Sequence, residues 1–431
     1  MAEIQPFRGW RYDIAQVGML ADVVAPPYDV IDSGEQDRLY QRHPCNIVRL
    51  ILNRDEPGDP SPAARYERAA RFLRQWQGEG VLSREPSPAL YVYHQSFDWE
   101  GVRYDRRGFL CRIRLEEFGT GSVFPHEQTM PGPKADRLAL WEHGHTCLSP
   151  VFGLYPGDAA TVQAPLDEAC GDRPPREVVD ADGVTHRLWA VDDADAIARA
   201  CAELADLPVF IADGHHRYET ALNFRRAHPD VDAAGFTMMM LVAMNDPGLA
   251  ILPTHRLVSG LPDLETGPLA ELLGEFFEIA EMGSGREAAR AAWAEIDGSG
   301  DQDCLALGTA ADQRWLLARL KDPVVMESLA ADHGEDWQGL GVSRLHTLVL
   351  DTILRPAFAG QNLSCRYVHQ LEEVDRAIEN REVPLAVLVA PATLEHVRRI
   401  ASQRETMPPK STFFFPKLLS GLVLYPLEED S

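Results

Sequence analysis

The sequence predicts a mixed α/β protein, an α+β arrangement in which strands and helices alternate irregularly. The chain has 431 residues, more than one hydrophobic core usually serves, with 45 % hydrophobic and 25 % charged residues. Short apolar or alternating runs are interspersed with segments of helical periodicity. Turn signals at Gly101 and Gly183 separate pairs of such runs, as in hairpins. This irregular order favours α+β subdomains over a doubly wound parallel sheet.

The first half of the chain is expected to be rich in hairpins. The Pro26–Pro27 pair cannot lie inside a helix, so it indicates an extended turn. Apolar stripes at helical spacing and alternating runs then predict the following elements. Helices are expected at residues 63–77 and 193–204, and strands at residues 46–52, 89–97, 104–115, 148–155, 176–182, 186–191 and 209–212.

In the second half, helical patterns alternate with strands from about residue 261. Helices are expected at residues 268–277, 286–296, 343–353, 371–380 and 393–403, and strands at residues 237–244, 249–252, 304–308, 314–319, 385–390, 411–415 and 421–427. We expect three parts: an N-terminal α/β segment, residues 1–88, packed on a core; a catalytic core, residues 89–260; and a C-terminal α/β subdomain, residues 261–431.

Charge and cysteine content exclude several classes of protein. A formal net charge of −25 repels nucleic acids and anionic membranes, so we expect neither as a partner. The apolar runs are too short to span a bilayer, and no export signal opens the sequence. The seven cysteines are dispersed without C-x-x-C spacing, which is typical of reduced thiols. These features together predict a cytoplasmic protein.

The most informative segment is a strand-to-helix junction at residues 207–222. An apolar run ends at Asp213-Gly214, and a helical pattern follows, so His215, His216 and Arg217 lie at the start of the helix. Helix N-termini attract anions, and a guanidinium suits phosphate. The junction therefore indicates a site for a phosphorylated ligand. A purely structural alternative is that Asp213 caps the helix and the histidines are scaffold.

A second polar segment covers residues 124–140. His126 and Glu127 lie in a loop broken by Pro and Gly, with Lys134 and Arg137 where a helix is expected to start, near Ala135. Glu127 is suited to act as a general base for a hydroxyl, and the two cations to hold phosphate charge. The alternative is a polar surface loop.

Two shorter motifs complete the candidate site. Thr254-His255-Arg256 follows two apolar segments at the end of a strand. Lys410-Ser411-Thr412 places a cation beside two hydroxyls, although no glycine frame makes it a P-loop. A metal site that uses His126, Asp213, His215 and His255 stays open at this point.

These segments together resemble the bacterial and archaeal family known as domain of unknown function 1015. The resemblance rests on residues 24–30, His126-Glu-x-Thr129, residues 132–137, residues 211–218, 252–256 and 409–412, and it covers nearly the whole chain. The family name implies no activity.

More distantly, Asp213-Gly-His-His-Arg-Tyr218 resembles the phosphate-binding motif of the ParB/sulfiredoxin superfamily, which includes free-serine kinases. The resemblance implies a ParB/sulfiredoxin-like core in which Glu127 is the base, Asp213 and His216 lie near the transferred phosphoryl group, and Arg217 binds it. This chain differs from those kinases in the longer interval between Glu127 and Asp213, and in its large flanking regions.

The expected function is phosphoryl transfer to a small hydroxylated metabolite, serine or phosphoserine. The alternatives are a phosphatase that uses the same site and a nucleotide-binding regulator without turnover. The expected cofactors are Mg²⁺, bound by Asp213, and a nucleotide such as ATP or ADP. Expected phosphate or nucleotide ligands are Lys134, Arg137, Gly214, His215, Arg217, Thr254, His255, Arg256, Lys410, Ser411 and Thr412.

Overall fold

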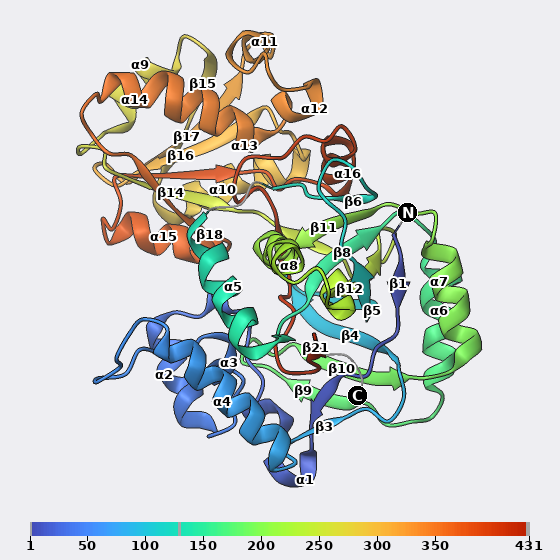
Figure 1. The fold of residues 1–431 in the computed structure, drawn as a ribbon. Coiled ribbons are helices and arrows are strands. Elements are labelled where there is room, and N and C mark those ends of the chain that lie inside the picture. Colours follow the sequence, from blue (N-terminus) through green and yellow to red (C-terminus); the bar gives the residue numbers. More distant parts are fainter. Residues whose placement is uncertain (1, 128–130, 428–431) are drawn as a thin grey trace. The chain divides into compact units, whose positions relative to one another are not determined.

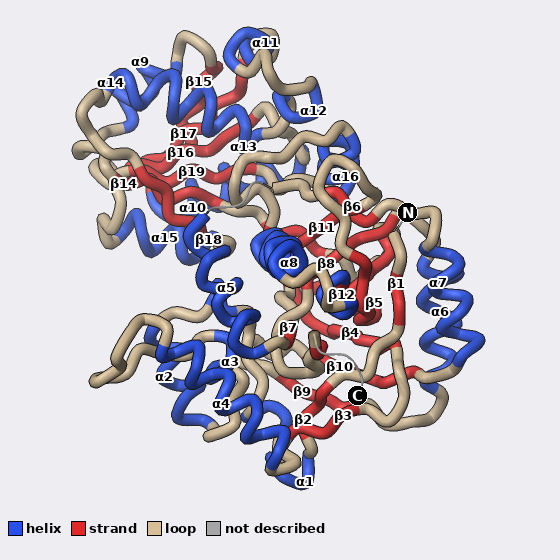
Figure 2. Tube along the Cα trace, viewed as in Figure 1, coloured by secondary structure: helices blue, strands red, loops and turns tan. Residues whose placement is uncertain are grey.

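The computed structural model describes residues 2–127 and 131–427 of the chain. It divides into two compact units. The first comprises Met1–Pro125, Thr129–Ala250 and Pro416–Ser431, and the second His126–Gln128 and Ile251–Phe415. Each unit has its own sheet and helices (Figure 1; Figure 2). The expected division into residues 1–88, 89–260 and 261–431 stays a prediction.

The first unit is built on a nine-stranded sheet with the order β6-β11-β8-β12-β5-β4-β10-β9, and β1 pairs with β5. Its pairings are antiparallel except for β6 with β11 and β8 with β12. The strands are β1 (Ile4–Gln5), β4 (Leu90–Trp99), β5 (Val102–Arg114), β6 (Val123–Phe124), β8 (Val151–Tyr155), β9 (Arg176–Val179), β10 (Thr185–Val191), β11 (Val209–Asp213) and β12 (Phe236–Ala243). Smaller sheets pair β2 (Trp10–Tyr12) with β3 (Leu82–Arg84), and β7 (Thr146–Cys147) with β21 (Tyr425–Pro426).

Helices cover both faces of this sheet, and its central strand β12 is therefore buried throughout. All eight residues of β12 are buried, as a strand covered on both faces requires. Helices α6 and α7 pack together on one side, and α5 and α8 on the other (Figure 1). The helices of the first unit are α1 (Ile14–Val17), α2 (Ser33–Arg42), α3 (Val48–Ile51), α4 (Ala64–Gly78), α5 (Pro131–Gly144), α6 (Ala159–Cys170), α7 (Ala194–Leu204) and α8 (His215–Ala227), with short 3-10 turns η1 (Leu20–Asp22), η2 (Tyr28–Val30) and η3 (Asp232–Gly235).

The second unit has a six-stranded antiparallel sheet with the order β15-β17-β16-β19-β14-β18. Its strands are β14 (His255–Ser259), β15 (Phe277–Ser284), β16 (Cys304–Thr309), β17 (Arg314–Leu320), β18 (Ser364–Val368) and β19 (Leu385–Val389), with β20 (Phe413–Phe415) outside this sheet and β13 (Ala250–Leu252) at the chain boundary between the units. Its helices are α9 (Thr266–Leu273), α10 (Gly285–Ser299), α11 (Val325–Leu329), α12 (Glu335–Gln338), α13 (Gly341–Arg344), the π-helix η4 (Leu345–Leu354), α14 (Arg355–Ala357), α15 (Leu371–Glu379) and α16 (Leu394–Ser402).

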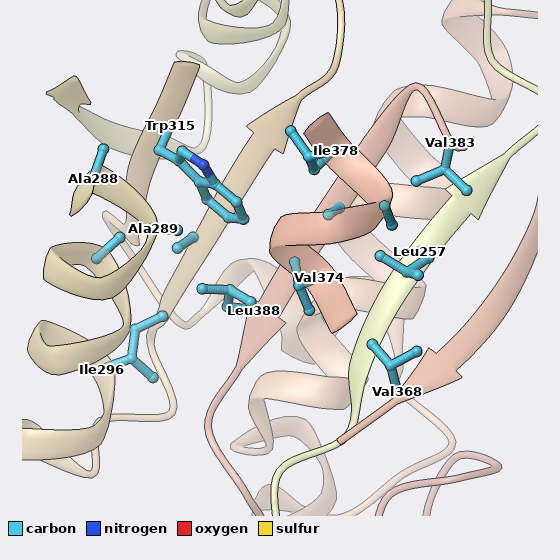
Figure 3. Close-up of a cluster of buried hydrophobic side chains, with 14 of the residues drawn as sticks. Leu257, Ala288, Ala289, Ile296, Trp315, Val368, Val374, Ile378, Val383 and Leu388 are labelled. Atoms are coloured by element: carbon cyan, nitrogen blue, oxygen red, sulfur yellow. The ribbon is translucent and has the colours of Figure 1, made fainter. Parts of the chain in front are cut away.

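A buried hydrophobic cluster joins α10 and α15 to one face of this sheet (Figure 3). Ala289 and Ile296 of α10 and Val374 of α15 pack with Trp315 and Leu257 of the strands. Because side chains alternate along a strand, Arg256 points to the opposite face from Leu257. This alternation places a charged residue on the other face of the sheet.

The mixed α/β class is confirmed, and so are most expected elements, including the hairpin of β4 and β5. Three local predictions are wrong. Residues 46–52 were expected to be a strand, but they contain α3, because the Asn46 side chain accepts from the N–H of Val48 and starts a helical turn. Helix α5 begins at Pro131 instead of near Ala135, since proline is tolerated in a first turn.

The third wrong prediction is the helix expected over residues 268–277. Helix α9 ends at Leu273, before Gly274, and the strand β15 starts at Phe277. Strand β18 was missed as well, since its exposed residues alternate with partly buried ones. All seven cysteines are free thiols. Within residues 2–127 and 131–427, no helix combines the length and the apolar character that a membrane span needs.

Candidate functional site

The strand-to-helix junction of the first unit is formed by β11, Gly214 and α8. Gly214 precedes α8 with a φ of 89°, in the left-handed region that glycine tolerates best. A Cβ atom at this position would lie 2.9 Å from the Arg217 guanidinium. Tyr218 fixes the first turn of α8, because its hydroxyl donates to the Glu116 carbonyl at 3.1 Å. Gly214 and Tyr218 therefore fix the backbone conformation of the junction.

Two cations converge on Asp213 at the end of β11, and we call Asp213, Arg217 and Lys417 the Asp213 cluster. Arg217 pairs with one carboxylate oxygen and Lys417 with the other. The side chains are 17 %, 8 % and 16 % exposed, respectively. Burial alone would raise the pKa of Asp213, but the charges of Lys417 and Arg217 hold it well below its usual range. Asp213 is therefore a carboxylate at neutral pH.

The surroundings of the Asp213 cluster add positive charge. Arg106 is fully buried, and burial lowers its pKa to about 10, so it stays protonated at neutral pH. Its charge interacts with Asp213. The charge of His215 also acts on Asp213. Arg106 also faces the charge of Asp246, so the excess positive charge beside the N-terminal end of α8 comes from Arg217 and Lys417 against the single carboxylate of Asp213. An anionic ligand is the natural complement of such a group.

Helix α5 brings two further predicted residues close to α8. Lys134 pairs with Glu219, on the second turn of α8. Arg137 donates to Asp136 at 2.8 Å and lies over the Tyr28 ring, 3.9 Å from its centroid. Arg137 and Arg217 both line a cavity of about 30 Å³. The structure therefore brings Lys134, Arg137 and the junction residues together within the first unit.

In the second unit, Glu127 is held by the backbone of Lys410. Its Oε1 atom accepts the N–H of Lys410 at 2.8 Å. The main chain of His126 accepts the N–H of Met407 at 2.7 Å, so the two segments run side by side. The ring of His126 is buried and its Nε2 atom lies 2.8 Å from Thr412 Oγ1. Thr129, from the same sequence motif, lies outside the described residues.

Arg256 anchors this same loop from the other side of Lys410. Its guanidinium donates to the Lys410 carbonyl at 2.9 Å and also to the Thr254 carbonyl. The Tyr367 ring lies 5.5 Å from the guanidinium. Lys410 has a φ of 60°, in the region that non-glycine residues avoid. Lys410 is thus held at its N–H by Glu127 and at its carbonyl by Arg256.

Apart from Lys410, the remaining predicted residues of the second unit are buried. Burial lowers the pKa of His255 to about 3, and the neighbouring Arg256 contributes to this shift. The His255 ring packs edge-on against Trp293 at 4.8 Å, which is a structural contact. Ser411 donates to the Pro408 carbonyl, and Lys410 is exposed. The second unit therefore groups Glu127, Arg256 and Lys410 with Ser411 and Thr412, whereas the junction residues belong to the first unit.

The Asp213 cluster does not fit a resident Mg²⁺ ion. Mg²⁺ prefers carboxylate, carbonyl and water oxygens in an octahedral arrangement. Both oxygens of Asp213 already face cations, which would repel a metal ion. In the described part of the chain, no group of three His, Cys, Asp or Glu side chains has a metal-binding arrangement. The charge excess at this site comes instead from arginine and lysine.

Sequence reasoning missed Lys417 and Arg106. Lys417 lies 204 residues after Asp213, and Arg106 is on β5. Neither belongs to a motif at the junction, because the sheet and the C-terminal segment bring them there. The one local indication of a role for Lys417 was its position directly after the apolar segment Phe413–Pro416.

Comparisons with known proteins give a family but not an activity. Solved structures with a loose likeness include a Glu-to-Gln mutant of a free serine kinase in complex with AMP, with a TM-score of 0.35 and 13 % identity over 68 % of this chain and 84 % of that one. A conserved hypothetical protein from Pyrococcus furiosus has a TM-score of 0.33 and 13 % identity, covering 68 % of this chain and 87 % of that one. A C-terminally truncated SbnI from Staphylococcus aureus has a TM-score of 0.32 and 9 % identity, covering 74 % and 87 %.

These structural likenesses are too loose to assign a function or a site. None of the curated proteins matches the sequence. The family model described as protein of unknown function DUF1015 matches residues 4–343, which is more than half of the chain. The chain therefore belongs to the DUF1015 family.

Proposed function

We propose that this protein is a phosphotransferase that acts on a small hydroxylated metabolite, with serine or phosphoserine as the first candidates. The observation that carries the proposal is the Asp213 cluster, with its excess of positive charge at the start of α8. A chain with a net charge of −25 must concentrate cations locally to hold a phosphate. This cluster does so within the first unit.

In the transfer step, an oxygen of the metabolite forms a bond to phosphorus while the bond from phosphorus to the bridging oxygen of a nucleotide donor breaks. The electron pair of the broken bond stays with the donor oxygen. Lys417 and the first-turn amides of α8 would stabilise the charge on the phosphoryl oxygens. Arg217, which is buried against Asp213, would orient the carboxylate and keep it ionised.

Glu127 is proposed as the general base on its sequence motif alone. This assignment rests on the His126-Glu127 motif and its resemblance to the free-serine kinases. The N–H of Lys410 donates to the Glu127 carboxylate and orients it.

Phosphorus NMR provides the decisive test of turnover. The wild-type protein is incubated with serine plus ATP, serine plus ADP, and phosphoserine alone. We expect phosphoserine to form from serine and a nucleotide. Glu127→Gln should lower turnover about 10²–10⁴-fold while affinity for the ligands stays within a few-fold. Full turnover in this variant would reject Glu127 as the base.

The phosphate-binding role of the Asp213 cluster has its own test. Lys417→Met should weaken binding of phosphoserine by about 1.5–3 kcal/mol, as expected for one charge-assisted contact. The matched control is Lys321→Met, which removes an exposed lysine of the second unit. Equal calorimetric affinity of wild type and Lys417→Met for phosphoserine would show that Lys417 does not bind the phosphate. Release of free phosphate from phosphoserine would indicate a phosphatase, and binding without turnover across the panel a regulator.

A further inference from the structure

A second region of the first unit gathers arginines around a cavity. The cavity has a volume of about 280 Å³ and lies next to β2 and β10. Its polar lining comes from three parts of the chain, namely Arg11, residues 85–89 and residues 173–192, and the indole of Trp189 adds an aromatic wall. The charged, polar and aromatic side chains of the lining include those of Arg11, Glu85, Ser87, Arg173, Arg176 and Trp189.

The guanidinium groups of this cavity are only partly neutralised. Arg11 pairs with Glu85. Arg176 donates to the Tyr12 carbonyl, and Arg173 donates to the carbonyls of Ala190 at 3.0 Å and Cys170 at 3.1 Å. Over residues 2–127 and 131–427, neither Arg173 nor Arg176 has a carboxylate within ion-pair distance.

Electrostatics shows that two of these cations are close to each other. Burial lowers the pKa of Arg176 and the charge of Arg11 lowers it further, whereas the charges of Glu85 and Asp13 raise it. Like charges in one cavity repel, so their placement costs free energy unless an anion lies between them. The other carboxylate of the lining, Asp192, accepts the Ser87 hydroxyl at 3.0 Å. The cavity therefore has three guanidinium groups against two carboxylates.

Trp189 fixes the shape of the apolar wall. Its indole N–H donates to the Arg173 carbonyl at 2.8 Å, so the ring is held in place beside the cations. Pro86, Pro174 and Leu188 add apolar surface. Pockets for drug-sized ligands span about 300–1,000 Å³, so this cavity suits a small metabolite.

We propose that this cavity is a binding site for a small metabolite that carries a phosphate or carboxylate group. The oxyanion would lie between Arg11 and Arg176, and the remainder of the molecule against Trp189. Guanidinium groups bind both oxyanions with a planar fork, which is the chemistry that the two candidates share.

The proposed site is separate from the Asp213 cluster of the same unit. Asp213 ends β11, whereas Trp189 lies on β10. Four strands, β8, β12, β5 and β4, lie between them in the sheet. At about 4.8 Å per strand, the two sites are roughly 24 Å apart along the sheet. A ligand in this cavity therefore cannot be the one held by the Asp213 cluster.

Calorimetry on the full chain at constant ionic strength tests the proposal. The probes are inorganic phosphate, a phosphomonoester and succinate, and the tighter class identifies the natural oxyanion. Arg176→Gln should weaken the best probe at least ten-fold. Arg71→Gln, which removes an exposed arginine of α4, should change it less than two-fold. Equal weakening by both variants would mean non-specific attraction to positive charge and would overturn the proposal.

A second variant keeps every arginine and fills the cavity. Ser87→Trp should abolish binding of the same probe, while circular dichroism confirms that the fold is kept. Probe binding should also change tryptophan emission in the wild type, and Trp189→Phe should remove that change. Binding that survives Ser87→Trp, or the same emission change in Trp189→Phe, would place the ligand elsewhere. Absence of binding by all three probes at millimolar concentration would reject the site.

Discussion

Arg217 in the first unit and Arg256 in the second are both buried, with 7 % and 1 % of their surface exposed, but their charges are balanced in different ways. Arg217 faces the carboxylate of Asp213, which Lys417 also contacts. Arg256 has carbonyl oxygens and an aromatic ring as its partners, and burial lowers its pKa to about 10. A buried charge is tolerated either by an ion pair or by oriented dipoles, and the two solutions respond differently to substitution.

The acidic residues of the two regions, Asp213 and Glu127, also differ in their surroundings. Asp213 lies between two cations that lower its pKa, so it stays ionised and balances their charges. Glu127 is only partly buried and accepts a backbone N–H. An acid that balances buried charge is needed for stability, whereas a partly buried acid keeps contact with solvent. The two regions therefore assign different roles to their carboxylates.

The largest effect is expected from removing the charge of Asp213. Asp213→Asn leaves Arg217 and Lys417 without a carboxylate, and should lower the free energy of unfolding by about 3–5 kcal/mol. Glu127→Gln keeps its acceptor for the Lys410 N–H and should cost less than about 1 kcal/mol. Urea denaturation at pH 7 measures both values. Similar losses in the two variants would remove the distinction between the two acids.

A smaller effect is expected when Arg256 is replaced. Arg256→Met leaves the Thr254 and Lys410 carbonyls without their donor, and should cost about 1–3 kcal/mol. Because Glu127 and Arg256 hold the N–H and the carbonyl of the same residue, Lys410, a double-mutant cycle with Glu127→Ala should show a coupling of about 0.5 kcal/mol or more. Strict additivity of the two substitutions would mean that Lys410 does not link them.

The pH dependence of stability should separate the two regions further. The pKa of His255 is about 3 in the folded protein and about 6.5 when unfolded, so the unfolded state binds the proton first. Stability is complete above pH 6.5 and falls as the pH decreases towards 3, by up to about 1.4 kcal/mol per pH unit. The contribution of Asp213, with its lowered pKa, is lost only below about pH 4.

Urea denaturation of wild type and His255→Leu between pH 7 and pH 4.5 measures this contribution. The slope of stability against pH should be smaller in the variant, because the titrating group has been removed. An unchanged slope would mean that His255 is not buried in its neutral form.

The smallest effects concern the two backbone turns. Gly214→Ala forces a Cβ into a left-handed conformation beside Arg217 and should cost about 1–2 kcal/mol. Lys410→Gly relieves the same conformation at a residue with φ 60° and should stabilise by a few tenths to about 1 kcal/mol. Thermal unfolding followed by circular dichroism compares them. A loss of stability in Lys410→Gly would show that its side chain contributes more than its backbone costs.

The sequence by itself determined the mixed α/β class, most strands and helices, and the junction at Asp213-Gly214. These features depend on periodicity and turn chemistry, which are local properties. The strand β11 and the helix α8 follow directly from the apolar run and the glycine that separates them. Local patterns were insufficient at residues 46–52, where a side-chain cap overrode the apolar run, and at Pro131, which starts a helix.

Only the tertiary structure decided which charges meet. Lys417 reaches Asp213 across 204 residues, and Arg256 reaches Lys410 across 154. Sheet order and strand alternation bring these partners together. The sequence around each residue contains no pattern that indicates its partner. The sequence therefore identified acids and cations suited to phosphate chemistry, whereas packing determined that Asp213 balances two buried cations and that Glu127 accepts the N–H of Lys410.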